Sequence, residues 1–322
     1  MRPWSKEGCA RARSARASWR ESARAPLAVF ALAFALIGAC DDSRRSSLPA
    51  SWPTSADQAS GTGGPGSSGP SGSPACGKTG AKTGVLAQRV PVFGKSRSYT
   101  LVVPPSYEPG TSYPLVYVLH GHGGNGAQAR RAIDLESAAN GRAIFVYPDG
   151  HGGGWDLDSP ASKNADVALF DATLAVTQSN YCVDLHRVFV AGFSNGAYMA
   201  NQLGCRRGDR IRAVASHAGG GPYEMAGEYD DTGHLRCNGK PVASLVVHGT
   251  ADGTVAMSEG QKSIDHWTYA NHCSGSAPTT PTGCITYRGC ANAVTACKVP
   301  GLAHTLWAQA KNVTWSFFDA QR

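Results

Sequence analysis

The sequence predicts an α/β domain in which helices cover both faces of a mainly parallel β-sheet. Short apolar runs bounded by glycine, proline or aspartate alternate with longer helix-compatible runs, and this alternation is typical of such a sheet. The chain after Cys76 has about 250 residues, a size at which one α/β domain is common. Hydrophobic residues make up 42% of the chain and charged residues 16%, which is a globular composition.

Short runs rich in valine, isoleucine, leucine and tyrosine are predicted to form the strands. They are Ser98–Val103, Leu115–Leu119, Ala143–Tyr147, Val188–Ala191, Ala213–Ser216, Ser244–Val247 and Thr295–Val299. The predicted helices are Gln128–Asn140, Asp166–Gln178, Ala197–Leu203, Ser258–Asn271 and Thr314–Ala320. Asn164 or Asp166 is expected to cap the second of these helices.

Residues 1–39 are predicted to be a lipoprotein-type export signal. Arginines up to Arg24 precede the apolar run Leu27–Ile37, which is too short for a permanent membrane span and fits a secretory signal. The sequence from Ile37 to Cys40 resembles a bacterial lipobox, in which cleavage before the cysteine is coupled to its lipidation. We therefore expect acyl chains on Cys40, which would anchor the protein stably. The alternative is an ordinary cleaved signal with a chance cysteine.

Residues 40–75 are expected to form a flexible linker. The segment from Ser43 to Pro74 is rich in serine, glycine and proline and cannot bury enough apolar surface to fold. A single folded domain is expected to follow over residues 76–322. This organisation predicts an exported monomer that is tethered to the cell envelope through a lipid anchor, or secreted.

The positive charge of the chain is concentrated in the export signal. The formal net charge is +7, and seven basic and two acidic residues precede Cys40. Only +2 is left for the mature chain. We therefore do not expect nucleic acid as a partner.

Eight cysteines remain when Cys9 and Cys40 are set aside. An even number in an exported chain favours disulfides, and zinc is disfavoured because Cys-x2-Cys pairs are absent. Eight cysteines allow 105 pairings, among which the sequence alone does not choose. Our hypothesis pairs Cys205 with Cys237 and Cys76 with Cys182, and places two bridges among Cys273, Cys284, Cys290 and Cys297.

Ser194 is the candidate nucleophile, at the centre of the G-x-S-x-G sequence from Gly192 to Gly196. The motif alone is weak in a chain with 39 glycines. Its context is stronger, because a predicted strand leads into it and a predicted helix leads out of it, as in the nucleophile elbow of the α/β-hydrolase fold. The alternative is a purely structural glycine-rich turn in which the serine caps the helix.

His304 and Asp252 are the candidate base and acid. A serine hydroxyl needs a base that takes its proton, and a carboxylate must orient that base. In this fold the nucleophile comes first, the acid second and the histidine last. Asp252 follows the predicted strand Ser244–Val247, and His304 follows the last predicted strand. Asp252 as a simple turn residue is the alternative.

Other titratable residues are weaker candidates. His217 and His234 precede Asp252, so their order is wrong, and His248 ends a strand, where a structural role is more common. His266 and His272 fall on or beside a helix and are expected at the surface. Asp149 precedes the serine and is expected to be a turn residue.

The glycine-rich segment from Leu115 to Gly126 resembles the loop that supplies one N–H group of an oxyanion hole. We assign the oxyanion hole to the backbone N–H groups of His122 and Asn195, with Gly121 as an alternative to His122. A metal site at His120 and His122 is not expected, since no further ligand is clustered nearby in sequence. No cofactor is expected.

Taken together, these segments resemble the exported esterases known as feruloyl esterases and polyhydroxybutyrate depolymerases. The resemblance covers essentially all of residues 76–322. Its pieces are Cys76–Lys78, Ser98–Pro104, Leu119–Gly121, Val146–Pro148, Gly154–Trp155, Asp166–Ala168, Tyr181–Asp184, Gly192–Gly196, His248–Asp252, Tyr287–Cys290 and Ala303–Thr305. The sequence around His304 departs from the family's usual G-G-H-T or H-T-W-P pattern, which leaves the neighbouring pocket wall open.

The resemblance implies a serine carboxylic ester hydrolase that acts through an acyl-enzyme on polymeric or polymer-linked esters. Hydroxycinnamate esters of plant cell-wall xylan are the first expectation, and a polyhydroxybutyrate depolymerase is the alternative. A non-catalytic wall-binding lipoprotein is the alternative of another class. Four aromatic residues are candidates for the substrate pocket: Trp155, Tyr198, Tyr223 and Trp307.

Overall fold

The computed structural model describes residues 72–225, 227–277, 279 and 283–321. These residues belong to one compact unit, Gly66–Arg322. The predicted export signal, Cys40 and residues 41–71 of the predicted linker lie outside the described residues. Among the helices of the described part, none has the length and apolar character needed to cross a bilayer.

Within the described residues the strands form one mixed sheet, in the order β1-β2-β4-β3-β5-β6-β7-β10-β9-β8. Neighbours from β4 through β10 in this order pair in parallel, and the strands on both flanks pair antiparallel. The strands are β1 (Gly84–Val92), β2 (Lys95–Val103), β3 (Tyr113–Leu119), β4 (Ile144–Pro148), β5 (Val183–Phe193), β6 (Ala213–His217), β7 (Ala243–Gly249), β8 (Gly275–Ser276), β9 (Cys284–Arg288) and β10 (Val294–Val299).

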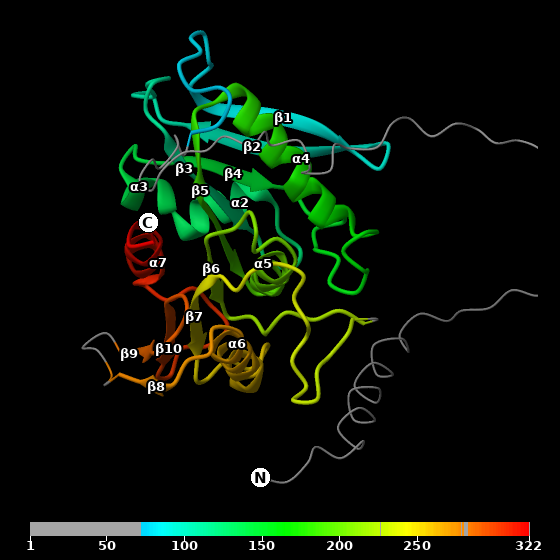
Figure 1. Ribbon diagram of the computed structural model, residues 1–322, viewed down its shortest axis with the longest axis vertical. Helices are drawn as coiled ribbons and strands as arrows, with labels where there is room; N and C mark the ends of the chain where they lie inside the picture. Colours follow the sequence, from blue (N-terminus) through cyan, green and yellow to red (C-terminus); the bar gives the residue numbers. More distant parts are fainter. Residues whose placement is uncertain (1–71, 226, 278, 280–282, 322) are drawn as a thin grey trace, which may run out of the picture. The chain divides into compact units, whose positions relative to one another are not determined.

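Helices cover both faces of this sheet (Figure 1). Helices α4, α5 and α6 pack into one hydrophobic cluster and α2, α3 and α7 into another. The strand side chains alternate between the clusters, as Tyr117 and Val118 of β3 do, because successive strand residues point to opposite faces. The helices are α2 (Gly126–Ile133), α3 (Leu135–Ala139), α4 (Ala165–Asn180), α5 (Asn195–Arg206), α6 (Met257–Ala270) and α7 (Ala310–Asp319).

The helix predicted over Gln128–Asn140 is in fact two helices. Asp134 adopts a left-handed backbone conformation with φ of 51°, ending α2 and starting α3. The prediction of one continuous helix was therefore wrong, because its apolar spacing continues across the break. Asn164, rather than Asp166, caps α4, since its side-chain oxygen accepts from the backbone N–H groups of Asp166 and Val167.

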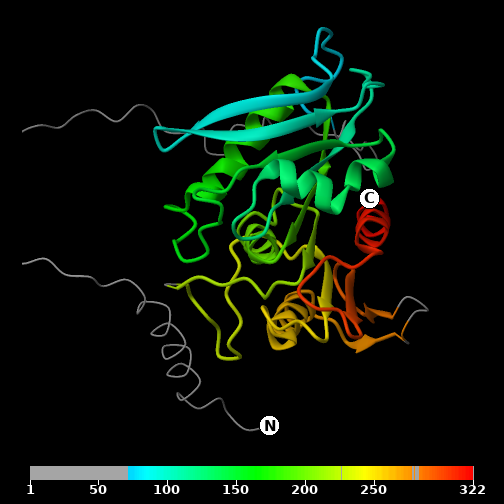
Figure 2. The ribbon, with the colours of Figure 1, turned by 180° about the vertical axis from the view of Figure 1, so that it is seen from behind.

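Strand β1 was not predicted from the sequence, although β1 and β2 form a long hairpin. Its side chains alternate between partly buried and exposed along most of its length, as expected for an edge strand, and Gln88 and Arg89 interrupt its apolar pattern. Figure 2 shows the hairpin turn projecting toward the same side as the loop between β4 and α4. This missed element contributes to the site described below.

Packing of the domain begins before Cys76. Ser73 and Ala75 are buried, and the Ser73 hydroxyl donates to the Tyr181 carbonyl at 2.6 Å. Residues 72–75, placed at the end of the predicted linker, thus pack on the start of β5, where Gly72 pairs with Asp184.

The described part of the chain contains four disulfides. The two pairs predicted from the sequence are confirmed. The structure also shows how the remaining four cysteines pair. The pairs are Cys76–Cys182, Cys205–Cys237, Cys273–Cys290 and Cys284–Cys297.

Candidate active site

Ser194 lies at a sharp turn between the end of β5 and the start of α5. Its φ of 55° and ψ of −121° form a strained backbone conformation for a residue with a side chain. The flanking glycines permit the turn. A Cβ atom at Gly196 would lie 2.5 Å from the carbonyl oxygens of Leu119 and His120, and one at Gly192 would collide with the Gly196 backbone.

Ser194, His304 and Asp252 form a continuous hydrogen-bonded chain. The Ser194 Oγ lies 2.9 Å from His304 Nε2, and His304 Nδ1 lies 2.7 Å from an Asp252 carboxylate oxygen. All three follow the carboxyl ends of parallel strands: Ser194 after β5, Asp252 after β7 and His304 after β10. The sheet therefore brings to one edge three side chains that are far apart in sequence.

The Asp252 carboxylate is buried and satisfied by hydrogen bonds. One oxygen accepts the backbone N–H groups of Thr254 and Val255 at 2.9 and 2.8 Å, and the other faces His304. Burial acts to raise the pKa of Asp252, but the hydrogen bonds from His304, Val255 and Thr254 outweigh it and hold this pKa below its usual value. The group is thus ionised and able to orient an imidazole.

His248 supports the loop that carries Asp252. Its Nε2 lies 2.8 Å from the Val255 carbonyl oxygen, to which it donates, and 3.6 Å from Asp252. The ring is buried. This position beneath the acid agrees with the structural role expected from the sequence.

The side chains of His217, His266 and His272 take no part in the hydrogen-bonded chain from Ser194 to Asp252. The buried His217 contacts the Thr314 hydroxyl at 2.9 Å, and burial lowers the pKa of His217 to about 4. His266 was predicted to lie at the surface, and this was wrong: it is 4% exposed, because its face of α6 packs against the Cys205–Cys237 disulfide, 3.4 Å from the Cys237 sulfur. His272 is exposed, as expected.

The loop after β3 lies directly against the nucleophile. A Cβ atom at Gly121 would be 3.4 Å from the Ser194 Cβ. His122 and Asn195 also converge, since a Cβ atom at Gly154 would lie 3.3 Å from a His122 ring nitrogen and 3.5 Å from the Asn195 side-chain oxygen. The Asn195 N–H group stands at the first position of α5, where helix N–H groups have no intrahelical acceptor. This placement is what an oxyanion hole needs.

His120 fixes the shape of the same loop. Its Nδ1 donates to the Gly121 carbonyl and its Nε2 accepts the Gly150 N–H group. Its own carbonyl oxygen accepts from the Trp155 indole at 2.8 Å. Both ring nitrogens are therefore occupied. Asp149 is more than a turn residue, because its carboxylate accepts from Gly126 N–H and the Ser98 hydroxyl.

A cavity of about 440 Å³ opens beside His122 and Asn195. Its walls come from the β1–β2 hairpin turn with Phe93, from the loop that carries Trp155, and from the beginning of α4. Arg97 and Asp166, which also line it, form a buried ion pair at 2.6 Å. Neither Arg97 nor the hairpin was predicted from the sequence to form part of the site. Asp166 was considered as the start of a predicted helix, as a possible helix cap and as part of the family resemblance, and nothing in the sequence indicates that it pairs with Arg97.

The four predicted pocket aromatics lie in different places. Trp155 lines the cavity, and its backbone N–H donates to the Asn195 side chain at 2.8 Å. The Tyr198 hydroxyl donates to Glu259. Tyr223 is 40% exposed, and Trp307 packs beside the hydrophobic cluster of α2, α3 and α7. Only Trp155 of the four is among the cavity-lining residues in the described part of the chain.

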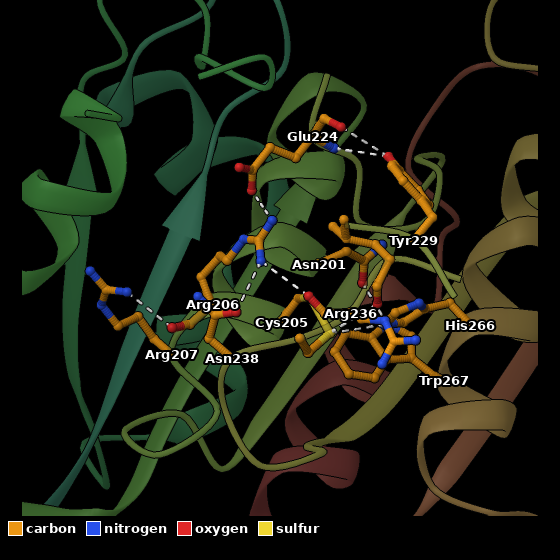
Figure 3. The surroundings of a disulfide bond; sticks show 12 residues. Asn201, Cys205, Arg206, Arg207, Glu224, Tyr229, Arg236, Asn238, His266 and Trp267 are labelled. Atoms are coloured by element: carbon orange, nitrogen blue, oxygen red, sulfur yellow. Dashed lines mark hydrogen bonds and ion pairs between the residues drawn. A yellow bond between two sulfur atoms is a disulfide. The ribbon is translucent and has the colours of Figure 1, made fainter. Parts of the chain in front are cut away.

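A long loop between β6 and β7 is fastened to α5 (Figure 3). The Cys205–Cys237 disulfide joins them, and Arg206 forms a buried ion pair with Glu224 and donates to the Arg236 carbonyl. His266 lies close to both sulfurs. Cysteine binds metal as a thiolate, so the disulfide leaves this cluster without free sulfur ligands.

Comparisons with known proteins relate the chain to esterases. The probable feruloyl esterase C of Aspergillus niger is 33% identical over 216 residues, which cover 65% of this chain and 73% of that protein. Feruloyl esterase C of Emericella nidulans is 32% identical over 263 residues, which cover 77% and 91%. No family model matches the chain.

Solved esterase structures share the fold. The acetyl xylan esterase from Aspergillus awamori superposes with a TM-score of 0.58 at 19% identity, covering 72% of this chain and 99% of that chain. A CE1 ferulic acid esterase from Anaeromyces mucronatus in complex with ferulic acid superposes with a TM-score of 0.51 at 19% identity, covering 78% and 97%. The α/β-hydrolase fold predicted from the sequence is confirmed.

Proposed function

The chain belongs to the feruloyl esterase family of carboxylic ester hydrolases, and from this premise we propose that Ser194, His304 and Asp252 are its catalytic residues. The observation that carries the proposal is the continuous hydrogen bonding from the Ser194 hydroxyl through His304 to Asp252. An orienting carboxylate, a base and a hydroxyl in this order activate the hydroxyl for attack on an ester carbonyl.

Acylation begins when Ser194 attacks the ester carbonyl carbon and its proton passes to His304 Nε2. The negative charge on the carbonyl oxygen is held by the backbone N–H groups of His122 and Asn195. The intermediate then collapses, His304 returns the proton to the leaving alcohol, and the acyl group stays on Ser194. Asp252 accepts a hydrogen bond from His304 Nδ1–H throughout, so that His304 Nε2 is free to take and return the Ser194 proton.

Deacylation repeats these steps with water in place of the alcohol. His304 takes a proton from the water as it attacks the acyl carbon, and the acid product leaves when Ser194 regains its proton. The chain's own residues supply every group in this sequence of steps.

The proposed substrates are hydroxycinnamate esters linked to plant cell-wall xylan. The feruloyl esterase relatives support this choice over polyhydroxybutyrate, and Trp155 in the cavity wall suits an aromatic acyl group. The proposal predicts rapid turnover of methyl ferulate. A comparison with soluble 3-hydroxybutyrate oligomers tests it, since exclusive turnover of the oligomers would reject it.

The catalytic assignment has its own test. A fluorophosphonate should label Ser194 in the wild-type protein, and Ser194→Ala should abolish labelling and lower the rate about 10³-fold or more. A variant of the neighbouring residue, such as Asn195→Asp, is not a suitable control for Ser194→Ala because it adds charge to the site. Ser179→Ala, on the exposed part of α4, is the matched control. A folded wild-type protein that is never labelled would favour a non-catalytic binding role.

Export and lipid anchoring through Cys40 complete the proposal. Four disulfides support export, since such bonds persist in oxidising compartments. The full chain expressed in bacteria with a radiolabelled fatty acid should incorporate label, and Cys40→Ser should not. We also propose a monomer, for which sedimentation of the lipid-free protein is the test.

A further inference from the structure

Two cavities lie near Ser194, and His122 of the candidate oxyanion hole lines both. The leaving alcohol must receive its proton from His304, so it lies on the histidine side. A cavity of about 290 Å³ is lined by Phe193, whose ring centroid lies 5.0 Å from that of His304, and by Leu306. The cavity of about 440 Å³ is lined by neither of these residues. Because the larger cavity is lined by Asn195, the residue next to Ser194, we assign it to the acyl group.

A hydrogen-bonded wall links the nucleophile turn to the far residues of this larger cavity. The Asn195 side chain accepts from Trp155 N–H, and the next residue, Asp156, donates its N–H to Asp166 at 2.8 Å. The other Asp166 oxygen accepts from Arg97 at 2.6 Å. Each link has a defined partner, so the position of Arg97 is fixed relative to the candidate oxyanion hole.

Arg97 places in the cavity wall hydrogen-bond donors that form no hydrogen bond within the described part of the protein. Its side chain is almost buried, and Nη2 donates to Asp166 and to the Asp149 carbonyl. Within the described part of the chain, its Nε and Nη1 groups form no hydrogen bond, and they are not among the fully buried polar atoms without a partner. Because Arg97 lines the cavity, these donors are available to a bound acyl group.

The lining also offers apolar surface on which an aromatic ring can pack. Val92, Phe93 and Trp155 line the cavity together with Arg97. Phe93 sits in the hairpin turn and is 62% exposed, so it has surface free to cover a ligand. An aromatic acyl group that bears oxygen substituents matches this combination, since the ring contacts apolar surface and the oxygens accept hydrogen bonds.

We propose that Arg97 is a specificity-determining residue, which donates hydrogen bonds to the hydroxyl or methoxy oxygens of a hydroxycinnamoyl group in this cavity. The inference rests on the proposed function and deepens it. Asp166 holds the guanidinium in place, and a charged donor forms the stronger type of hydrogen bond to a ligand oxygen. An unsubstituted cinnamoyl group would leave these donors without an acceptor, at a cost in binding.

The test compares methyl ferulate with methyl cinnamate, which lacks the ring oxygens. The wild-type protein should have the higher kcat/KM for methyl ferulate. In Arg97→Gln the ratio of the two kcat/KM values should fall about tenfold or more, mainly through KM for methyl ferulate. Arg142→Gln, which removes an arginine from a surface ion pair with Asp319, is the control and should keep the wild-type ratio.

A second variant controls for misfolding of Arg97→Gln. Arg97→Gln leaves the buried Asp166 carboxylate without its cation, whereas Arg97→Met combined with Asp166→Asn removes both charges. The ratio should fall in this double variant as well. A wild-type measurement needs no variant at all: ferulic acid should inhibit hydrolysis of p-nitrophenyl acetate at a concentration about tenfold lower than cinnamic acid does.

The outcomes separate this inference from the proposed function. A ratio in a folded Arg97 variant within twofold of wild type, or equal inhibition by the two acids, would overturn the role of Arg97 while leaving the esterase intact. Hydrolysis of p-nitrophenyl acetate with no turnover of either cinnamate ester would instead reject the proposed substrate class.

Discussion

Asp252 and His304 are joined by a 2.7 Å hydrogen bond, although 52 residues separate them in the chain. The reason is the parallel pairing of β7 with β10, in which Gly249 lies opposite Val299. The loops that follow these two strands start side by side at one edge of the sheet. The geometry of the candidate acid and base is thus a direct consequence of strand register.

Asp252→Asn should lower kcat by about 10⁴-fold with little change in fold. An asparagine amide can donate a hydrogen bond to His304 Nδ1, which would place the ring proton on Nε2. A protonated Nε2 cannot accept the proton of Ser194. Methyl ferulate kinetics measure the loss. Asp265→Asn, on an exposed position of α6, is the control, and a variant at Asp252 with near wild-type kcat would refute the assignment of the acid.

Gly196→Ala should destabilise the nucleophile turn by about 1–3 kcal/mol. The new methyl group would lie 2.5 Å from two backbone carbonyl oxygens, those of Leu119 and His120, so β3 and the turn must separate. Both the free energy of unfolding in urea and the rate of fluorophosphonate labelling should fall. Gly110→Ala, where a Cβ atom meets nothing within 4 Å, should leave both unchanged; equal behaviour of the two variants would count against the packing argument.

The free energy of unfolding should decrease as the pH falls from about 6.5 to about 4. Burial lowers the pKa of both His217 and His266 from 6.5 to about 4. In this window the unfolded chain binds a proton at each histidine and the folded chain does not, so acid favours unfolding. Each histidine contributes a slope of about 1.4 kcal/mol per pH unit.

Urea unfolding of the oxidised protein at several pH values measures this slope. His217→Gln should reduce it by about one histidine's share, while His272→Gln, at an exposed position, should not alter it. A slope unaffected by His217→Gln would mean that His217 is not held neutral by the fold.

Removal of the Cys205–Cys237 disulfide should lower the free energy of unfolding by about 3 kcal/mol. The bond closes a separation of 32 residues and fastens the β6–β7 loop to α5. The double variant Cys205→Ala with Cys237→Ala should unfold at lower urea and be cut more readily by protease between residues 221 and 239. Protease resistance equal to wild type would show that the Arg206–Glu224 ion pair holds the loop unaided.

The three candidate catalytic residues could be predicted from the sequence because each carries a local signal. Ser194 has flanking glycines that only a tight turn requires, and Asp252 and His304 follow apolar runs that read as strands. Chain order then selects among the histidines, since the fold fixes the order of nucleophile, acid and base. The even number of cysteines and the expected export predicted disulfides, whereas the sequence alone did not choose among the pairings.

The cavity and the burial of His266 could not be predicted, because they depend on residues that meet only after folding. Arg97 comes from β2 and its partner Asp166 from α4, 69 residues later. The β1–β2 hairpin that completes the cavity has the weak pattern of an exposed edge. The sequence was enough to identify the candidate reactive groups and their order along the chain. Tertiary structure alone decided what surrounds them, because pocket walls are built from long-range contacts that leave no periodic or local trace in the sequence.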